Sequence, residues 1–163
     1  MLHNWANPSP RSSDMLRMSN IGKPTRQLWY DLKSENESTE SLPAPVFIKF
    51  FYGHLLEEVL LFLVKISGHK VGNEQKEVSV SGIKGHMDCT IDGEVVDIKT
   101  ASGFAFKKFK DGTLAEQDTF GYLPQLAGYE EAEGTKKGGF LDINKETGEL
   151  ALFRTYEFAK PNI

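Results

Sequence analysis

The sequence contains very little cysteine, because Cys89 is the single thiol among 163 residues. One thiol excludes an internal disulfide framework, a four-cysteine zinc site and a four-cysteine iron–sulfur cluster. Long apolar stretches are missing as well, since the longest run, Val59–Val64, is far too short to span a bilayer. Residues Met1–Pro10 hold no uninterrupted apolar core. We therefore expect no signal peptide, no membrane segment and a cytoplasmic location.

A strong excess of charge is also absent. The chain has 19 Lys and Arg against 23 Asp and Glu, a formal net charge of −4. This balance gives no bulk attraction to nucleic acid, so a nucleic-acid partner would have to be held by a local patch. With 39% hydrophobic and 26% charged residues, the composition is that of a globular protein. The length predicts one domain over residues 1–163, with residues 1–45 as an N-terminal extension that contains a helix and residues 46–163 as the core.

Hydrophobic periodicity predicts the secondary structure. We expect helices over Thr25–Leu32, Val46–Ser67 and Thr119–Ala132, and strands over Glu77–Ser81, Ile83–Ile91, Glu94–Thr100, Lys136–Asn144 and Leu150–Tyr156. This order predicts an α/β fold in which a mixed central β-sheet is flanked by helices. Apolar residues go nearly all the way round the second helix, which we expect to be buried on most sides. Glu57 lies among them, and a buried carboxylate is costly unless a cation meets it.

Asp92-Gly93 lies between two alternating runs and predicts a β-hairpin with a type I′ turn. The turn sets a register with the pairs Ile91–Glu94, Thr90–Val95, Cys89–Val96, Asp88–Asp97 and His86–Lys99. Successive side chains of a strand point to opposite faces. The hairpin therefore has one apolar face, with Met87, Cys89, Ile91, Val96 and Ile98, and one polar face, with His86, Asp88, Asp97 and Lys99.

The polar face brings like charges together. Two carboxylates directly opposite each other repel, because their Cβ atoms are roughly 5 Å apart. Exposure to water, a shared proton or a divalent metal such as Mg²⁺ would each explain Asp88 and Asp97 in these positions. Lys99 on the same face could also neutralise the pair without a metal. With Glu57 added, the set is three acids and one amine, which suits metal-assisted phosphodiester hydrolysis.

Four short blocks follow one another in the chain: Gly-His-Leu-Leu-Glu at 53–57, Gly-His-Met-Asp at 85–88, Asp-Ile-Lys at 97–99 and Gln-Leu-Ala-Gly-Tyr at 125–129. This order resembles the PD-(D/E)xK nuclease superfamily, and within it the RecB-like exonucleases, which include small exonucleases of bacteriophages. Asp-x-Lys alone is a weak motif, whereas four blocks in order are much more specific. The resemblance covers roughly residues 50–131, and Ser19–Tyr30 is also similar to the N-terminal segment of such proteins.

The resemblance implies a single nuclease domain with a restriction-endonuclease-like core. It also implies a Mg²⁺ site, in which Mn²⁺ can substitute, with the ligands Glu57, Asp88, Asp97 and the backbone carbonyl of Ile98. By the same resemblance Lys99 would be the catalytic lysine, and Gln125 and Tyr129 would organise the site and contact nucleic acid.

The chain departs from the family pattern at two points. Many relatives use a histidine of the first helix as a metal ligand, so His54 is the alternative to Glu57. We favour Glu57 because of its buried setting. Some relatives bind an iron–sulfur cluster through four cysteines, and with one cysteine this chain is expected to bind none.

Two further features bear on DNA binding and on the site. Phe104–Lys110 interleaves aromatic side chains with lysines. Lys107 and Lys108 could bind a single strand whose bases stack on the rings, and the alternative is a strand end with core phenylalanines and solvated lysines. His86 either orients a neighbouring side chain of the site through a hydrogen bond or ligates the metal itself.

The sequence thus predicts a metal-dependent DNA exonuclease that hydrolyses phosphodiester bonds from DNA ends, with single strands as a candidate substrate. A structure- or sequence-specific endonuclease with the same site is the alternative among enzymes. A non-catalytic DNA-binding module on a decayed nuclease fold is the alternative outside them. If a bacteriophage encodes the chain, its compartment is the host cytoplasm. The oligomeric state stays open.

Overall fold

A mixed five-stranded β-sheet lies at the centre of the computed structural model, which describes residues 16–33 and 43–158. Its strands, in spatial order, are β1 (Val71–Gly72), β4 (Cys89–Ile91), β5 (Glu94–Ala101), β6 (Gly138–Asn144) and β7 (Leu150–Arg154). The neighbours β5 and β6 are parallel, and the other pairs are antiparallel. Two further strands, β2 (Lys76–Val80) and β3 (Ile83–Met87), form a hairpin of their own.

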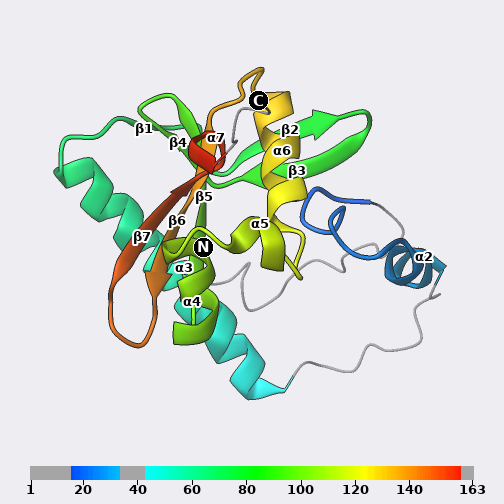
Figure 1. Cartoon of the computed structure of the whole chain (residues 1–163), viewed down its shortest axis with the longest axis horizontal. Coiled ribbons are helices and arrows are strands. Elements are labelled where there is room, and N and C mark those ends of the chain that lie inside the picture. The colour runs from blue at the N-terminus through cyan, green and yellow to red at the C-terminus, as the bar shows by residue number, and fades with distance from the viewer. Residues whose placement is uncertain (1–15, 34–42, 159–163) are drawn as a thin grey trace.

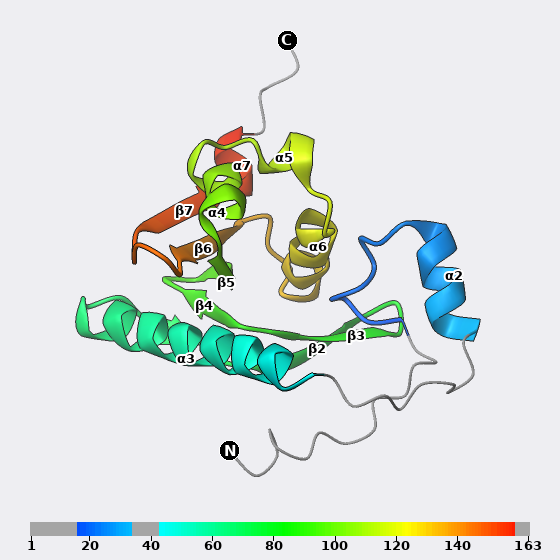
Figure 2. The same cartoon turned by 90° about the horizontal axis from the view of Figure 1, so that it is seen from below.

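Helices cover both faces of the sheet (Figures 1 and 2). The long helix α3 (Ala44–Ile66) crosses one face, and α4 (Gly103–Lys110), α5 (Leu114–Gln117) and α6 (Tyr122–Ala132) lie over the other. The helix α2 (Thr25–Lys33) lies on the side of the β2–β3 hairpin, and the short α7 (Thr155–Phe158) follows β7. The predicted α/β fold, with a mixed sheet flanked by helices, is confirmed.

Each face of the sheet has its own apolar core, because successive side chains of β5 and β6 point to opposite sides. On the α3 side, buried residues of the helix and the sheet form one cluster: Leu60, Leu61, Cys89, Val96, Ile98 and Ile143. On the opposite side, α4, α5 and α6 cover a second cluster, which includes Val95, Phe109, Leu114, Leu126, Tyr129, Phe140 and Phe153. Met18, from the segment before α2, packs into this second cluster.

The hairpin at Asp92-Gly93 forms as predicted. Its two turn residues have φ values of 50° and 87°, the positive values that a type I′ turn requires. The predicted pairs Ile91–Glu94, Thr90–Val95 and Cys89–Val96 are present. The single strand predicted over Ile83–Ile91, however, breaks at Asp88 into β3 and β4.

The break arises because a second hairpin gives β3 a partner close in sequence. Ser81 and Gly82 also have positive φ values, 50° and 81°, and their turn pairs β3 with β2. His86 therefore lies opposite Glu77, and Met87 packs into the second cluster, on the other side of the sheet from the position predicted for it. Two predicted strand pairs are wrong: His86–Lys99 and Asp88–Asp97.

The helix predicted over Val46–Ser67 is present as α3, but it is not buried on most sides. Leu60 and Leu61 are its buried residues. The sheet covers one side of the helix, and large apolar side chains on the opposite side stay exposed. Within residues 16–33 and 43–158, no helix combines the length and the apolar character needed to cross a membrane.

The aromatic-basic segment Phe104–Lys110 lies within helix α4, so the strand end of the second alternative is wrong, but core phenylalanines and exposed lysines are present. Phe106 and Phe109, three positions apart, are the buried side chains of this helix, whereas Phe104 is exposed. The last predicted strand, Leu150–Tyr156, ends at Arg154, where α7 begins.

Candidate functional site

The candidate site lies where β4 stops covering the edge of β5. The β4–β5 pairing ends at Val96, and among the described residues no strand pairs with that edge beyond it. The side chain of Asp88 takes the place of a neighbouring strand, because its Oδ2 accepts a hydrogen bond from the Ile98 N–H at 2.7 Å. The Asp88 carbonyl in turn accepts a hydrogen bond from the Gln75 N–H at 2.9 Å. Backbone contacts therefore hold Asp88 beside the middle of β5.

Asp97 and Lys99 project from β5 to the same face and form an ion pair. The Lys99 Nζ lies 2.6 Å from Asp97 Oδ2 and 4.7 Å from the centroid of the Tyr122 ring. Asp97 is only 2% exposed. Burial opposes the charge of Lys99, but the Asp97 carboxylate outweighs it and raises the pKa of this lysine, with help from Asp88. Lys99 is therefore a charged ammonium at neutral pH.

Glu57 reaches the site from α3. Its Oε1 accepts a hydrogen bond from Gln75 Nε2 at 2.7 Å, and its Oε2 lies 3.9 Å from His54 Nδ1. Burial is the main cause that raises the pKa of Glu57, and His54 opposes this rise. The charges of Glu58 and then of Asp97 raise this pKa further. The sequence predicts that a cation meets this acid, whereas the contacts that the structure gives Glu57 are the neutral amide of Gln75 and, at 3.9 Å, the imidazole of His54.

The three carboxylates act on one another electrostatically. Burial, and after it the charges of Asp97 and Glu57, raise the pKa of Asp88 to about 7. The hydrogen bond from the Ile98 N–H and the charge of Lys99 lower this pKa, but by less. Lys99 forms an ion pair with Asp97 and is attracted by Asp88, so the three acids of the site outnumber its lysine and leave an excess of negative charge when all of them are ionised. The neighbouring Cys89 thiol has its pKa raised to about 12, by burial and by Asp88.

Each acid of the site is turned toward a separate donor: Asp88 toward the Ile98 N–H, Asp97 toward Lys99 and Glu57 toward Gln75. In the described part of the chain, no group of three or more His, Cys, Asp or Glu side chains is arranged to hold a metal ion. The chemistry of the donor set still suits a hard cation, since it consists of carboxylates with a backbone carbonyl nearby. Among the described residues, Asp97 Oδ2 accepts no hydrogen bond beyond its contact with Lys99.

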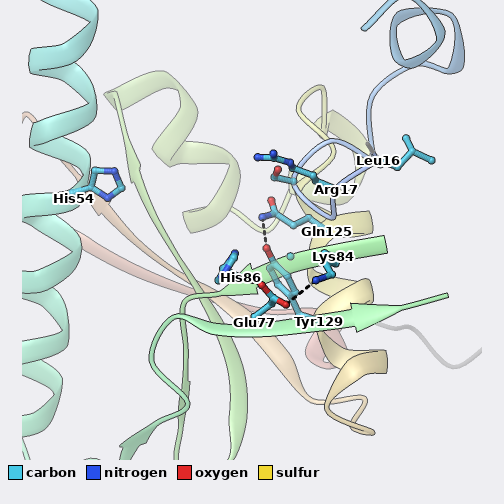
Figure 3. Close-up of a pocket in the computed structure, with 10 residues that line it drawn as sticks. Leu16, Arg17, His54, Glu77, Lys84, His86, Gln125 and Tyr129 are labelled. Carbon is cyan, nitrogen blue, oxygen red and sulfur yellow. Dashed lines mark hydrogen bonds and ion pairs between the residues drawn. The ribbon is translucent and has the colours of Figure 1, made fainter. Parts of the chain in front are cut away.

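Figure 3 shows a cavity of about 580 Å³ whose lining does not include the three acids or Lys99, but does include His54, whose Nδ1 lies 3.9 Å from Glu57 Oε2. Its lining comes from the segment before α2 and from α3, β2, β3 and α6: Leu16, Arg17, Ser19, His54, Glu77, Lys84, Gly85, His86, Gln125 and Tyr129. Gln125 and Tyr129 lie one turn apart on α6, and the Gln125 Nε2 donates a hydrogen bond to the Tyr129 Oη at 3.0 Å. Burial, with added effects from Asp97 and Asp88, raises the pKa of Tyr129, so this wall of the cavity lies close to the acids.

Three of the other predicted residues lie apart from the acids. His86 Nε2 is 3.7 Å from Glu77 Oε2, so its contact is with Glu77 at the cavity wall rather than with the acids or Lys99. Lys107 is exposed on α4. Lys108, on the same helix, donates a hydrogen bond to the Gln117 carbonyl at 3.0 Å and lies over the Phe104 ring. Neither lysine lines the cavity.

The sequence interpretation missed Asp142 of β6, which the parallel register places opposite Lys99. Asp142 is fully buried, and its carboxylate oxygens accept no well-formed hydrogen bond from the described residues. Burial raises its pKa to about 7, and the Ile143 N–H and Lys99 only partly offset this. The sequence does show a single aspartate among apolar residues at 140–143, which marks it as unusual. Its position opposite Lys99, however, becomes visible only once the pairing of β5 with β6 is known.

The chain matches no protein-family model and no curated protein sequence. Among solved structures, one described as the crystal structure of SSO0001 is similar, with 14% sequence identity and a TM-score of 0.49. The alignment covers 94% of this chain and 71% of that chain. A likeness of this degree carries no argument about function.

Proposed function

We propose that this protein is a Mg²⁺-dependent deoxyribonuclease of the PD-(D/E)xK type that hydrolyses phosphodiester bonds from DNA ends. One observation carries the proposal. Burial and the charge of Asp97 raise the pKa values of Glu57 on α3 and Asp88 at the β3–β4 junction, and Asp97 itself forms an ion pair with the charged Lys99. This combination of Glu57, Asp88, Asp97 and Lys99 is the set that the sequence motifs select.

The electrostatics of the site favour a bound cation. Buried carboxylates that lie close together and accept few hydrogen bonds are costly when ionised. A divalent cation would offset that charge, and Mg²⁺ prefers carboxylate and carbonyl oxygens. Glu57, Asp88 and Asp97, with the carbonyl of Ile98, are the residues that would hold it. When bound, the cation lowers the pKa of a water molecule and stabilises charge on a phosphate.

Lys99 would act on the reacting groups directly. An ammonium in a site shielded from water can orient the attacking water and offset the negative charge that develops on phosphorus oxygens. Its ion pair with Asp97, at 2.6 Å, fixes the position of Nζ and keeps it protonated. Tyr122, whose ring lies 4.7 Å from Nζ, supports that position from α6.

The cavity shown in Figure 3 offers a place for the end of a strand. Arg17 supplies positive charge for phosphates, and Gln125 supplies an amide that can bond a base or a phosphate, whereas Lys84 is paired with Glu77 at 3.1 Å. A volume of about 580 Å³ is within the usual range for a bound small molecule. Such a space receives a terminal nucleotide more readily than a continuous duplex, which favours exonucleolytic over internal cleavage.

A time course on end-labelled DNA tests the proposal. We expect Mg²⁺-dependent release of nucleotides from single- or double-stranded linear DNA and no attack on covalently closed circles. Asp97→Ala and Lys99→Ala should each abolish hydrolysis, whereas Lys65→Ala, which breaks an exposed ion pair with Glu74, should leave it unchanged. If Asp97→Ala and Lys99→Ala both cleave DNA as fast as the wild type, the proposed mechanism is wrong.

Two other results would select the alternatives. Cleavage of closed circles would identify an endonuclease with the same site. Calorimetry that detects DNA binding without uptake of Mg²⁺ or Mn²⁺, together with no cleavage of any substrate, would identify a non-catalytic DNA-binding module.

A further inference from the structure

The outer face of α3 carries an apolar pattern that the proposed function does not use. Six side chains repeat at alternating spacings of four and three residues, which is the heptad pattern of helices that pack along one another. We call them the α3 seam: Ile48, Tyr52, Leu55, Val59, Phe62 and Ile66. Each of them is between 42% and 63% exposed, whereas Leu60 and Leu61 on the inner side are buried.

The α3 seam is continuous rather than scattered. It contains no charged side chain and follows a helix of 23 residues, which is about 34 Å long at 1.5 Å per residue. Single exposed apolar residues are normal on a protein surface, but a large contiguous patch marks a contact site. In Figure 2, α3 is the outermost of the described elements on its side of the sheet, and the exposed fractions of the α3 seam show that these side chains are accessible.

Neither another segment of this chain nor a membrane surface fits the α3 seam well. The chain segment that precedes α3, residues 34–42, reads Ser-Glu-Asn-Glu-Ser-Thr-Glu-Ser-Leu, and residues 1–15 and 159–163 also contain no heptad of apolar residues. A helix that lies on a membrane surface has a polar face rich in Lys and Arg. On α3, Lys49 and Lys65 are balanced by Glu57 and Glu58.

We propose that the α3 seam is the contact surface of a homodimer, in which α3 of one copy packs against α3 of a second copy. A heptad seam is matched by an identical seam, so the surface is complementary to itself, as a two-fold interface requires. With roughly 200 Å² for each fully exposed side chain, the exposed fractions of the α3 seam amount to about 600 Å² per copy. Stable interfaces bury about 800 Å² per partner, and Phe51 and Leu63, exposed beside the α3 seam, supply much of the remainder.

This dimer leaves the candidate site free. Glu57 lies two positions from both Leu55 and Val59, which places it about 200° around the helix from each. The α3 seam and the acids are therefore on opposite sides of α3, and the two cavities of a dimer would face away from the shared interface. The proposal does not depend on the proposed function, because it concerns a face of α3 that takes no part in the site.

Sedimentation velocity or light scattering on the full chain tests the dimer. We expect a concentration-dependent species of twice the 18.3 kDa of one chain. The double variant Leu55→Glu/Phe62→Glu should weaken dimerisation at least about 100-fold, because each charge enters the apolar contact twice and such central residues carry most of the binding energy. The matched control Trp29→Glu changes an equally exposed aromatic residue on α2 and should leave the dimer intact.

Folding of the variants is checked by circular dichroism and by thermal unfolding. The midpoint of wild-type unfolding should rise with protein concentration, and that of the seam variant should not. If the double variant fails to fold, the milder Val59→Asn replaces it in the same assays. A wild-type chain that stays monomeric at hundreds of micromolar overturns the proposal. So does a dimer that persists in folded seam variants, because another surface then forms it.

Discussion

Replacing Asp88 by Asn should stabilise the metal-free protein at alkaline pH. The pKa of Asp88 rises from 3.8 to about 7 on folding, because the carboxyl is buried near Asp97 and Glu57. An acid whose pKa is raised by folding costs nothing below the pKa of the unfolded chain, and its cost grows as the pH rises to about 7. A shift of about three units corresponds to at most about 4 kcal/mol above that pH.

The asparagine keeps the local geometry while it removes the charge. Its side-chain oxygen can still accept the hydrogen bond that Ile98 donates to Asp88 at 2.7 Å. We therefore expect Asp88→Asn to raise the unfolding free energy by about 2–4 kcal/mol at pH 8 in a chelating buffer, or the melting temperature by about 5–10 °C. As the pH falls below about 7 the difference should shrink by about 1.4 kcal/mol per pH unit, and it should vanish only below pH 3.8, where the wild-type carboxyl is neutral in the folded and the unfolded chain alike.

Thermal unfolding followed by circular dichroism at pH 5, 6, 7 and 8 measures this difference. Asp92→Asn is the matched control, because Asn-Gly also suits a type I′ turn and folding lowers the pKa of Asp92 through its hydrogen bond with His69. This control should lose stability rather than gain it. A variant at Asp88 that is no more stable than wild type at pH 8, or whose gain is independent of pH, would refute the electrostatic account of the site.

Three further outcomes follow from the same contacts. Lys99→Met should lower the unfolding free energy by about 3 kcal/mol at pH 8, because it leaves Asp97 buried without its cation, and adding Asp97→Asn should restore most of the loss in denaturant titrations. The Cys89 thiol, with a pKa of about 12, should resist alkylation at pH 8 until the chain unfolds, which mass spectrometry after timed labelling detects. Gly85→Ala places a methyl group 2.9 Å from the Tyr129 ring and should cost about 1–3 kcal/mol of stability, seen as a lower melting temperature; on the proposed function it should also weaken DNA binding, because it perturbs the cavity wall.

The sequence predicted best those features that local chemistry determines. The Asp92-Gly93 turn fixes its hairpin, because a type I′ turn matches the twist of the strands and Asp-Gly favours it, and three of the predicted pairs are present. The same signal at Ser81-Gly82 was not used, although Ser and Gly there also take positive φ. Recognising it would have paired β3 with β2 and moved His86 away from Lys99.

Other features depend on contacts between distant segments. The position of Asp88 beside Ile98 results from a strand that changes partner, and no periodicity in the sequence marks where that change occurs. Asp142 comes next to Lys99 only because β6 lies parallel to β5 after a connection of more than thirty residues. The sequence motifs predicted which acids belong to the site. The donor that each acid contacts depends on the arrangement of the strands and helices, which the motifs do not specify.

Helix α3 has three groups of side chains with different surroundings. Leu60 and Leu61 cover the sheet, Glu57 faces the acids, and the α3 seam faces outward. Apolar residues on all sides predicted a buried helix, and in one copy of the chain only the inner side meets that expectation. A second copy would bury the outer side as well, so the conflict between the sequence and the isolated fold is itself a reason to test dimerisation before the proposed nuclease activity is assayed.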